Sequence, residues 1–208
     1  ATVGTENLTP DSIAQMMVGR ELSNLYPPKH EPDVDAEVVL SVRGLSAPGI
    51  SDISFDLRRG EILGFAGLIG SGRTAVAEAI AGLSAKTGGE VIVNGATADY
   101  PDVSKSVTAG LAYMTKDRKG RGLLLNAGLQ PNLTLLTLKK HLKMGFLDGR
   151  SEAQALDRAV RRFDIRARDP SVQVGKLSGG NQQKLMLGKT MESDPEIVIM
   201  DEPTRGID

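Results

Sequence analysis

The sequence LSGGNQQK at residues 177–184, followed by IVIMDEPTRGID at residues 197–208, decides the fold of this chain. Within the first string, Ser178, Gly179 and Gly180 directly precede a predicted helix. Such a helix start suits a terminal phosphate, because its first N–H groups lack intrahelical partners, its dipole is positive and glycine permits close approach. The alternative is structural, with Ser178 an ordinary N-cap beside two loop glycines.

The second string predicts a strand that ends in two carboxylates. The apolar run Ile197–Met200 is typical of a buried strand, and Asp201 and Glu202 follow it directly. A carboxylate at Asp201 can bind Mg²⁺, and one at Glu202 can polarise an attacking water molecule. An apolar strand that ends in such a pair is common by itself, so its meaning depends on the other motifs.

A third string, GLIGSGRT at residues 67–74, predicts a phosphate-binding loop. It lies between the apolar segment Ile62–Ala66, which we expect to be a buried strand, and a predicted helix at Thr74–Ala81. Its glycines let backbone N–H groups curl around phosphate oxygens, and the hydroxyl of Thr74 is a candidate Mg²⁺ ligand. The alternative is a tight strand-to-helix connection that binds nothing.

One residue departs from the phosphate-loop pattern. The pattern GxxxxGK[ST] has lysine where this chain has Arg73. Arginine keeps the positive charge, but its planar guanidinium is bulkier than an ammonium and cannot take the same point between the β- and γ-phosphates. We therefore expect nucleotide binding to survive at this loop while turnover suffers.

Length and composition limit the possible functions. The 208 residues suit one domain with an appendage, and 25 basic against 26 acidic residues leave a net charge of -1. This balance excludes a general electrostatic field for nucleic acid or membranes. The chain has no cysteine, no apolar run near the ~20 residues that span a bilayer and no signal-peptide pattern. We expect a cytoplasmic protein, whose work at a membrane would need another chain.

The pattern along the chain divides it into two parts. A short amphipathic helix is predicted after Thr9, and YPPKHEPD at residues 26–33 is typical of an extended linker. We expect residues 1–36 to form this helix and linker, and residues 37–208 to form the main domain.

The main domain alternates between strand and helix signals. We expect strands at residues 38–42, 53–57, 62–66, 90–93, 111–114 and 197–200, and helices at 74–81, within 130–163 and at 181–191. This order predicts an α/β core around a largely parallel sheet, to which the opening β segments and the middle helices are additions.

The three strings together resemble the ATP-binding-cassette (ABC) ATPases. Walker A is at residues 67–74, the signature at 177–184, Walker B at 197–202, and the D-loop runs to Asp208. The resemblance implies a P-loop NTPase fold with a RecA-like core, an N-terminal antiparallel β subdomain and a helical subdomain inserted at about residues 122–176. It also implies two facing cassettes, with each ATP held between the Walker A of one and the signature of the other.

More narrowly, the chain is similar to the second cassette of tandem ATPases that energise bacterial import of monosaccharides such as ribose, xylose, arabinose and galactose. Four features carry this: MVGRE at 17–21 with LYP at 25–27, GLIGSGRT with its arginine, DRK at 117–119 with GL at 122–123, and NQQK in the signature. The resemblance implies a fragment, with the first cassette upstream and the switch-histidine segment after Asp208. We expect His30 and His141, which cannot replace that histidine, to be surface residues.

The resemblance also assigns roles and partners. It implies that ATP and Mg²⁺ bind, with Thr74 and Asp201 as metal ligands and Glu202 as the catalytic carboxylate. The partners are the first cassette, an integral membrane permease and, indirectly, a periplasmic sugar-binding protein, at the inner face of the cell membrane. The residues expected to contact nucleotide are Gly67, Gly70, Ser71, Gly72, Arg73, Thr74, Ser178, Gly179, Gly180 and Gln182.

In such tandem proteins the two sites are unequal. We expect Ser178, Gly179 and Gly180 to complete the hydrolytic site on the first cassette, while the pocket behind Arg73 is slow. Two further departures weaken that pocket. Lys116 stands where the family has Glu or Gln and cannot ligate Mg²⁺ when protonated, and residues 45–50 hold no aromatic to stack on adenine.

Other functions stay open at this point. A non-transport ABC ATPase of DNA repair or translation would bind nucleic acid or ribosomes, and a regulatory module would bind nucleotide without turnover. The imported solute could also be a nucleoside or a signalling molecule. The basic residues at 116–121 and 139–140 favour a solvated or coupling surface over nucleic-acid binding, because the net charge is near zero.

Overall fold

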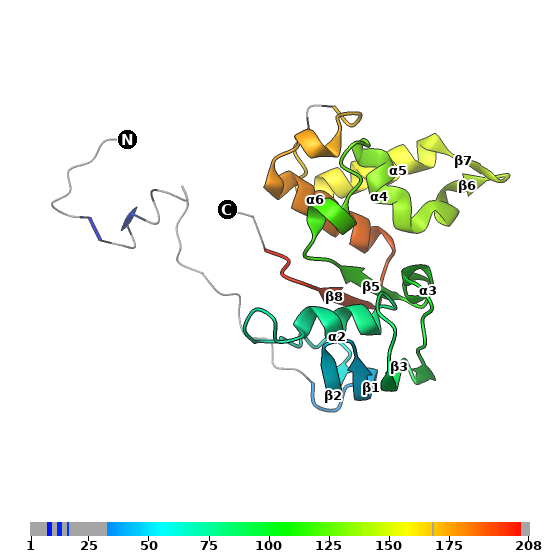
Figure 1. Ribbon diagram of the computed structural model, residues 1–208. Helices are drawn as coiled ribbons and strands as arrows, with labels where there is room; N and C mark the ends of the chain where they lie inside the picture. The colour runs from blue at the N-terminus through cyan, green and yellow to red at the C-terminus, as the bar shows by residue number, and fades with distance from the viewer. Residues whose placement is uncertain (1–7, 10–11, 14–15, 17–32, 168, 205–208) are drawn as a thin grey trace.

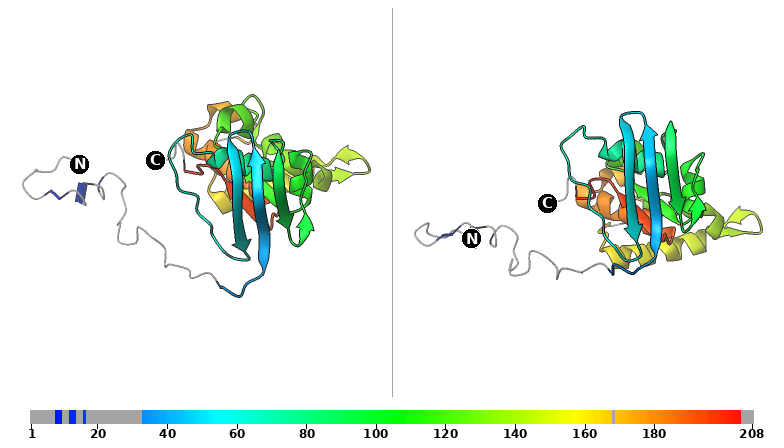
Figure 2. Two further views of the ribbon diagram at one scale, coloured as in Figure 1. Left: turned by 60° about the horizontal axis from the view of Figure 1, so that its bottom comes forward. Right: turned by 90° about the horizontal axis from the view of Figure 1, so that it is seen from below.

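The computed structural model describes residues 8–9, 12–13, 16, 33–167 and 169–204. In it, strand β1 (Val38–Ala47) lies inside an antiparallel sheet of order β2-β1-β3-β4. Strand β2 (Ile50–Arg58) pairs with one edge of β1 and β3 (Gly88–Val93) with the other, as Figure 2 shows. The short β4 (Ala96–Thr97) closes the far edge. This sheet confirms the predicted N-terminal antiparallel β subdomain.

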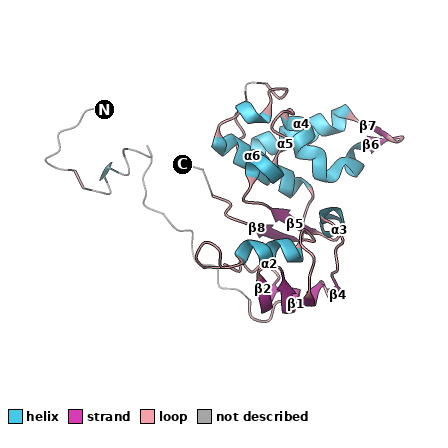
Figure 3. Ribbon diagram, in the orientation of Figure 1, coloured by secondary structure: helices cyan, strands magenta, loops and turns pink. Residues whose placement is uncertain are grey.

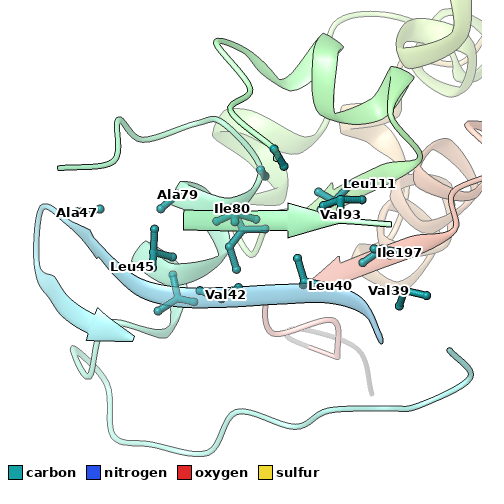
Figure 4. Close-up of a cluster of buried hydrophobic side chains, with 14 residues drawn as sticks. Val39, Leu40, Val42, Leu45, Ala47, Ala79, Ile80, Val93, Leu111 and Ile197 are labelled. Carbon is teal, nitrogen blue, oxygen red and sulfur yellow. The ribbon is translucent and has the colours of Figure 1, made fainter. Parts of the chain in front are cut away.

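Helix α2 (Arg73–Ile80) covers one face of this sheet. Its side chains Val76, Ala79 and Ile80 are buried in a cluster with β1 residues such as Val42 and Leu45, both fully buried (Figure 4). Apolar residues at this helical spacing form one stripe, and burying that stripe fixes the helix on the sheet. The position of α2 fixes the phosphate loop that precedes it.

A parallel pair of strands lies between the two halves of the molecule (Figure 1). Strand β5 (Leu111–Met114) pairs in register with β8 (Ile197–Met200), and both match their predicted bounds. Leu111 packs in the cluster of α2, whereas Met114 packs in a second cluster with the helices. The short α3 (Val103–Thr108), capped by Asp102, leads into β5.

Two sequence predictions about the sheet are wrong. Parallel pairing is limited to β5 and β8 among the described strands, so the sheet is not largely parallel. The segment 62–66 forms no strand and is exposed, with Ile62 at 96%. Its apolar run is broken by Gly64 and followed by a glycine-rich loop, a composition that disfavours strands. Phe65 instead packs edge-on against Phe55, with ring centroids 5.0 Å apart.

The helical region confirms the predicted α-helical subdomain. Figure 3 shows the helices gathered above the β5–β8 pair. Their core includes Leu129, Leu133, Leu156, Leu185 and Met186. The elements are η2 (Arg118–Gly122), α4 (Leu129–Thr134), η3 (Leu135–His141), the hairpin β6 (Leu142–Lys143) and β7 (Phe146–Leu147), α5 (Gly149–Phe163), η4 (Val174–Lys176) and α6 (Gly179–Glu192).

His141 is buried, so the prediction that it lies on the surface is wrong. Its side chain is 4% exposed, and Nδ1 lies 2.9 Å from Ser151 Oγ. Nε2 lies 3.5 Å from Thr137 Oγ1 and 4.0 Å from the Glu192 carboxylate. These polar partners, from η3, α5 and α6, offset the cost of burying the imidazole. His30 lies outside the described residues.

Little of the N-terminal segment falls within the described residues. Residues 12, 13 and 16 are helical, and Thr9 and Ser12 exchange hydrogen bonds that cap this turn, in agreement with the helix predicted after Thr9. The MVGRE stretch, the linker up to residue 32 and the D-loop from residue 205 lie outside the described part. Where the chain is described, no helix combines the length and apolar character needed to cross a bilayer.

Candidate functional site

The phosphate loop enters α2 through two glycines with left-handed backbone. Gly70 has φ +87° and Gly72, the N-cap of α2, has φ +91°. A Cβ at Gly72 would lie 2.7 Å from Ile50 Cγ2, and one at Gly67 would lie 2.6 Å from Ser71 Oγ. The left-handed backbone therefore favours glycine at Gly70 and Gly72, and crowding by Ile50 adds to this at Gly72. Residues 67–71 are exposed, so an anion can reach the loop.

Thr74 and Asp201, the two predicted metal ligands, lie together in the structure. The Thr74 hydroxyl donates to Asp201 Oδ2 at 2.8 Å. Thr74 is in the first turn of α2, and Asp201 follows β8 directly, where its backbone N–H donates to Met114 O at 2.9 Å. The parallel pair of strands therefore places the carboxylate against the start of the helix.

Lys116 completes a row of three polar groups. Its ammonium donates to Thr74 Oγ1 at 2.8 Å, so the hydroxyl lies between a cation and a carboxylate. Mg²⁺ requires near-octahedral oxygen ligands at about 2.0–2.1 Å. If it bound the Thr74 hydroxyl, it would be repelled by the Lys116 ammonium bonded to the same oxygen. Within the described ranges, no cluster of three His, Cys, Asp or Glu side chains is placed to hold a metal. As arranged, these groups do not fit Mg²⁺.

Tyr113, in β5, lies close enough to Asp201 for the carboxylate to affect its phenol. Burial raises the pKa of its phenol to about 12, and the negative charges of Asp201 and Glu78 act in the same direction. Its hydroxyl is buried and has no hydrogen-bond partner among the described residues. The phenol is therefore neutral at neutral pH. Glu78 itself is paired with Arg121 at 2.8 Å. At neutral pH Tyr113 therefore adds no charge beside Asp201.

Glu202, the predicted catalytic carboxylate, follows Asp201 at a bend in the chain. Its φ of 47° is left-handed, an uncommon and costly conformation for a residue with a Cβ. The next residue is tied to α6, because Gln183 Nε2 donates to Pro203 O at 2.6 Å. Helix α6 and the strand end are thus joined directly after the two carboxylates.

The signature forms the start of helix α6. Ser178 is its N-cap and is exposed, and its Oγ accepts from the Asn181 backbone N–H at 3.4 Å and from Asn181 Nδ2 at 2.9 Å. Gly179 and Gly180 form the first turn. In the described part of the chain, no hydrogen bond connects residues 178–180 with the phosphate loop. The predicted anion-binding end is therefore not bonded to this chain's own phosphate loop, and Ser178 is exposed.

Gln182 holds the signature from behind. Its side chain is buried, and its Nε2 donates to Val174 O and Leu177 O, both at 3.1 Å. Its Oε1 accepts from Arg118 Nε at 3.1 Å. The amide expected to contact nucleotide is thus engaged in positioning the loop before α6.

Sequence reasoning missed the internal role of the basic stretch 116–121. Three of its cations have partners within the chain: Lys116 bonds Thr74, Arg118 bonds Gln182 and Gln183, and Arg121 pairs with Glu78. The DRK motif marked the stretch, but net charge alone favoured a solvated surface. The stretch instead links the phosphate loop, α2 and the signature helix.

Comparison with known proteins agrees with this geometry. A family model described as ABC transporter matches residues 50–205. The chain is 44% identical over 212 residues to the ribose import ATP-binding protein RbsA 2 of Agrobacterium fabrum, and 40% identical over 217 residues to the xylose import ATP-binding protein XylG of Pseudomonas savastanoi pv. phaseolicola. The alignments cover 99% and 100% of this chain but 42% of each relative. The chain therefore spans about two fifths of the relatives' length.

Solved structures with the same fold include two dimeric ATP-binding cassettes. One is described as a bacterial ABC transporter cassette, and the other as a post-hydrolysis state bound to ADP and Pi. Each is similar with a TM-score of 0.70 and 18% identity, over 81% of this chain and 76% of the other. This likeness confirms the predicted mixed α/β fold of a P-loop NTPase.

Proposed function

Since this chain belongs to the ABC transporter family, we propose that it is the second cassette of a tandem ATPase that energises import of a monosaccharide. In this proposal its signature acts on ATP held by the first cassette, and closure of the two cassettes around ATP moves the permease. The similarity to relatives named for ribose and xylose import supports a sugar as the imported solute. A nucleoside or a signalling molecule is the alternative.

The exposed start of α6 carries this proposal. Ser178, Gly179 and Gly180 offer a hydroxyl and helix N–H groups, and they make no hydrogen bond to the chain's own described phosphate loop. The positive potential of a helix N-terminus falls off within about one turn, so a phosphate must lie directly against it to bind. The facing cassette would supply that nucleotide, because the signature of one cassette meets the Walker A of the other.

The chain's own pocket has the weaker role. Gly67, Gly70, Ser71, Gly72 and Arg73 would hold the phosphates of a second nucleotide. Thr74 and Asp201, expected as metal ligands, are bonded to each other and contacted by Lys116. Glu202 would be the catalytic carboxylate of this slow site. The bonds at Thr74 and Asp201, as arranged, do not fit Mg²⁺.

The partners follow from the same proposal. The permease would dock on the helical subdomain, where the β6–β7 hairpin exposes Met144 at 93% and Phe146 at 79%. Exposed apolar side chains at one tip are typical of a contact with another protein. The sugar-binding protein acts through the permease, the complex sits on the inner face of the cell membrane, and the net charge of -1 argues against nucleic acid.

The full-length transporter tests the assignment. With Ser178→Arg, bulk and charge enter the facing site, and we expect ATPase activity to fall about a hundredfold. With Glu202→Gln, we expect a loss of less than about threefold, because the slow pocket contributes little. Abolished activity in Glu202→Gln with normal activity in Ser178→Arg would contradict the proposal. Co-purification with an integral membrane permease would separate a transporter from a non-transport ABC ATPase.

A further inference from the structure

The ammonium of Lys116 is held at a defined point in the pocket. It donates to Thr74 Oγ1 at 2.8 Å, and Lys116 lies two residues beyond the end of β5. Strand β5 pairs with β8, whose end carries Asp201, and the Asp201 N–H donates to Met114 O at 2.9 Å. Both ends of the row are thus fixed to the same pair of strands.

The hydrogen bonds fix which group in this row donates and which accepts. A threonine hydroxyl has one proton and two lone pairs. At Thr74 the proton goes to Asp201, and a lone pair accepts from the ammonium. The ammonium has three donors, and Thr74 takes one of them, which leaves two for phosphate oxygens and water. A divalent cation at this hydroxyl would face the repulsion of a fixed positive charge at short range.

The positive charges around the row offset part of the charge of a nucleotide without a metal. Arg73, in the first turn of α2, keeps a positive charge beside the phosphate loop, and the helix N-terminus adds a partial positive charge. Lys116 adds a second full charge beside the carboxylate of Asp201. Divalent cations in phosphate sites supply this same neutralisation.

We propose that Lys116 takes the place of Mg²⁺ in this chain's own pocket, which binds a nucleoside triphosphate without any divalent cation. The inference rests on the proposed function only in that this pocket holds a nucleotide. It concerns the chain's own phosphate loop, whereas the signature serves the facing site. The two ideas therefore have different readouts.

Equilibrium binding of trinitrophenyl-ATP to the 208-residue chain, in Mg²⁺ and in EDTA, tests the inference. We expect wild-type dissociation constants within about twofold of each other. Lys116→Glu places a second hard oxygen ligand beside Asp201, so we expect its binding to be at least about tenfold weaker in EDTA than in Mg²⁺. Lys119→Glu is the matched control, an exposed lysine of the same stretch, and it should bind equally in both buffers.

Folding of each variant is checked by circular dichroism and thermal melting. If Lys116→Glu does not fold, Lys116→Gln carries the test, because it removes the charge and can still bond Thr74. It should also gain dependence on Mg²⁺. Wild-type binding that weakens about tenfold in EDTA overturns the inference, as does a folded wild-type chain that binds in neither buffer. Neither result changes the outcome expected for Ser178→Arg in the full-length transporter. Failure of this inference can therefore be told apart from failure of the proposed role of the signature.

Discussion

The two helix starts that could meet a phosphate, those of α2 and α6, are built in opposite ways. Helix α2 begins at left-handed Gly72 without a side-chain cap, and its Thr74 hydroxyl is bonded on both sides by Asp201 and Lys116. Helix α6 begins at exposed Ser178, which caps the helix through its own side chain. At the first start a cation of the chain itself holds the hydroxyl, whereas at the second the exposed serine hydroxyl is bonded, among the described residues, only to Asn181 of its own helix.

The largest effect is expected at the α2 start, from Gly72→Ala. The new Cβ would lie 2.7 Å from Ile50 Cγ2 on a backbone with φ +91°. Strain and crowding together should lower the free energy of unfolding by about 2–3 kcal/mol, measured by urea denaturation. The matched control is Gly70→Ala, with φ +87° and open space around its Cβ, which should cost only about 1 kcal/mol. Equal losses in the two variants would show that Ile50 does not crowd the loop.

The α6 start depends on its buried support, and Gln182→Leu tests this. The change leaves Val174 O and Leu177 O without the amide donor, and Arg118 loses an acceptor. We expect a loss of about 2 kcal/mol in urea denaturation. Binding of trinitrophenyl-ATP to the chain's own loop should stay unchanged, because among the described residues Gln182 makes no direct hydrogen bond to Thr74 or the phosphate loop. A matched loss of nucleotide binding would mean that the two ends are coupled.

Between the two starts, Tyr113 should make stability sensitive to alkaline pH. Its pKa is raised from 10.0 to about 12, so the folded state keeps a proton that the unfolded state loses. Stability is therefore complete below pH ~10 and falls as pH rises from ~10 to ~12. Allowing for partial exposure, the loss is roughly 1–2 kcal/mol. Tyr113→Phe should remove this part of the loss in urea denaturation at each pH, and identical profiles would contradict the assignment.

Local pattern was sufficient for much of the fold. Strands β5 and β8 have their predicted bounds because four apolar residues between turn signals leave few alternatives. The antiparallel sheet, helix α6 and the glycines of the phosphate loop follow from similar local rules. The segment 62–66 shows the limit, because a continuous apolar run specifies hydrophobicity and not the partner that would bury it.

Contacts between distant residues were beyond sequence reasoning. His141 is buried because Ser151 and Glu192, from two other helices, offer polar partners. The bond from Lys116 to Thr74 joins the segment after β5 to the start of α2, 42 residues apart in the sequence, so no local rule places it. The sequence did mark Lys116 as a departure, since an ammonium cannot ligate a metal. Only the fold shows what the ammonium contacts instead.

The smallest effect on stability is expected for Ser178→Gly, which separates capping of α6 from phosphate binding by the Ser178 hydroxyl. Glycine is a tolerated N-cap, so Ser178→Gly should lower the free energy of unfolding by only a few tenths of a kcal/mol. The change nevertheless removes the exposed hydroxyl, and in the full-length transporter we expect ATPase activity to fall about tenfold if that hydroxyl donates to the facing nucleotide. Asn181→Ala is the control, because it removes the Nδ2 contact to Ser178 Oγ while leaving the hydroxyl in place. Full activity in Ser178→Gly would assign Ser178 to capping alone and leave phosphate binding to the backbone N–H groups of α6.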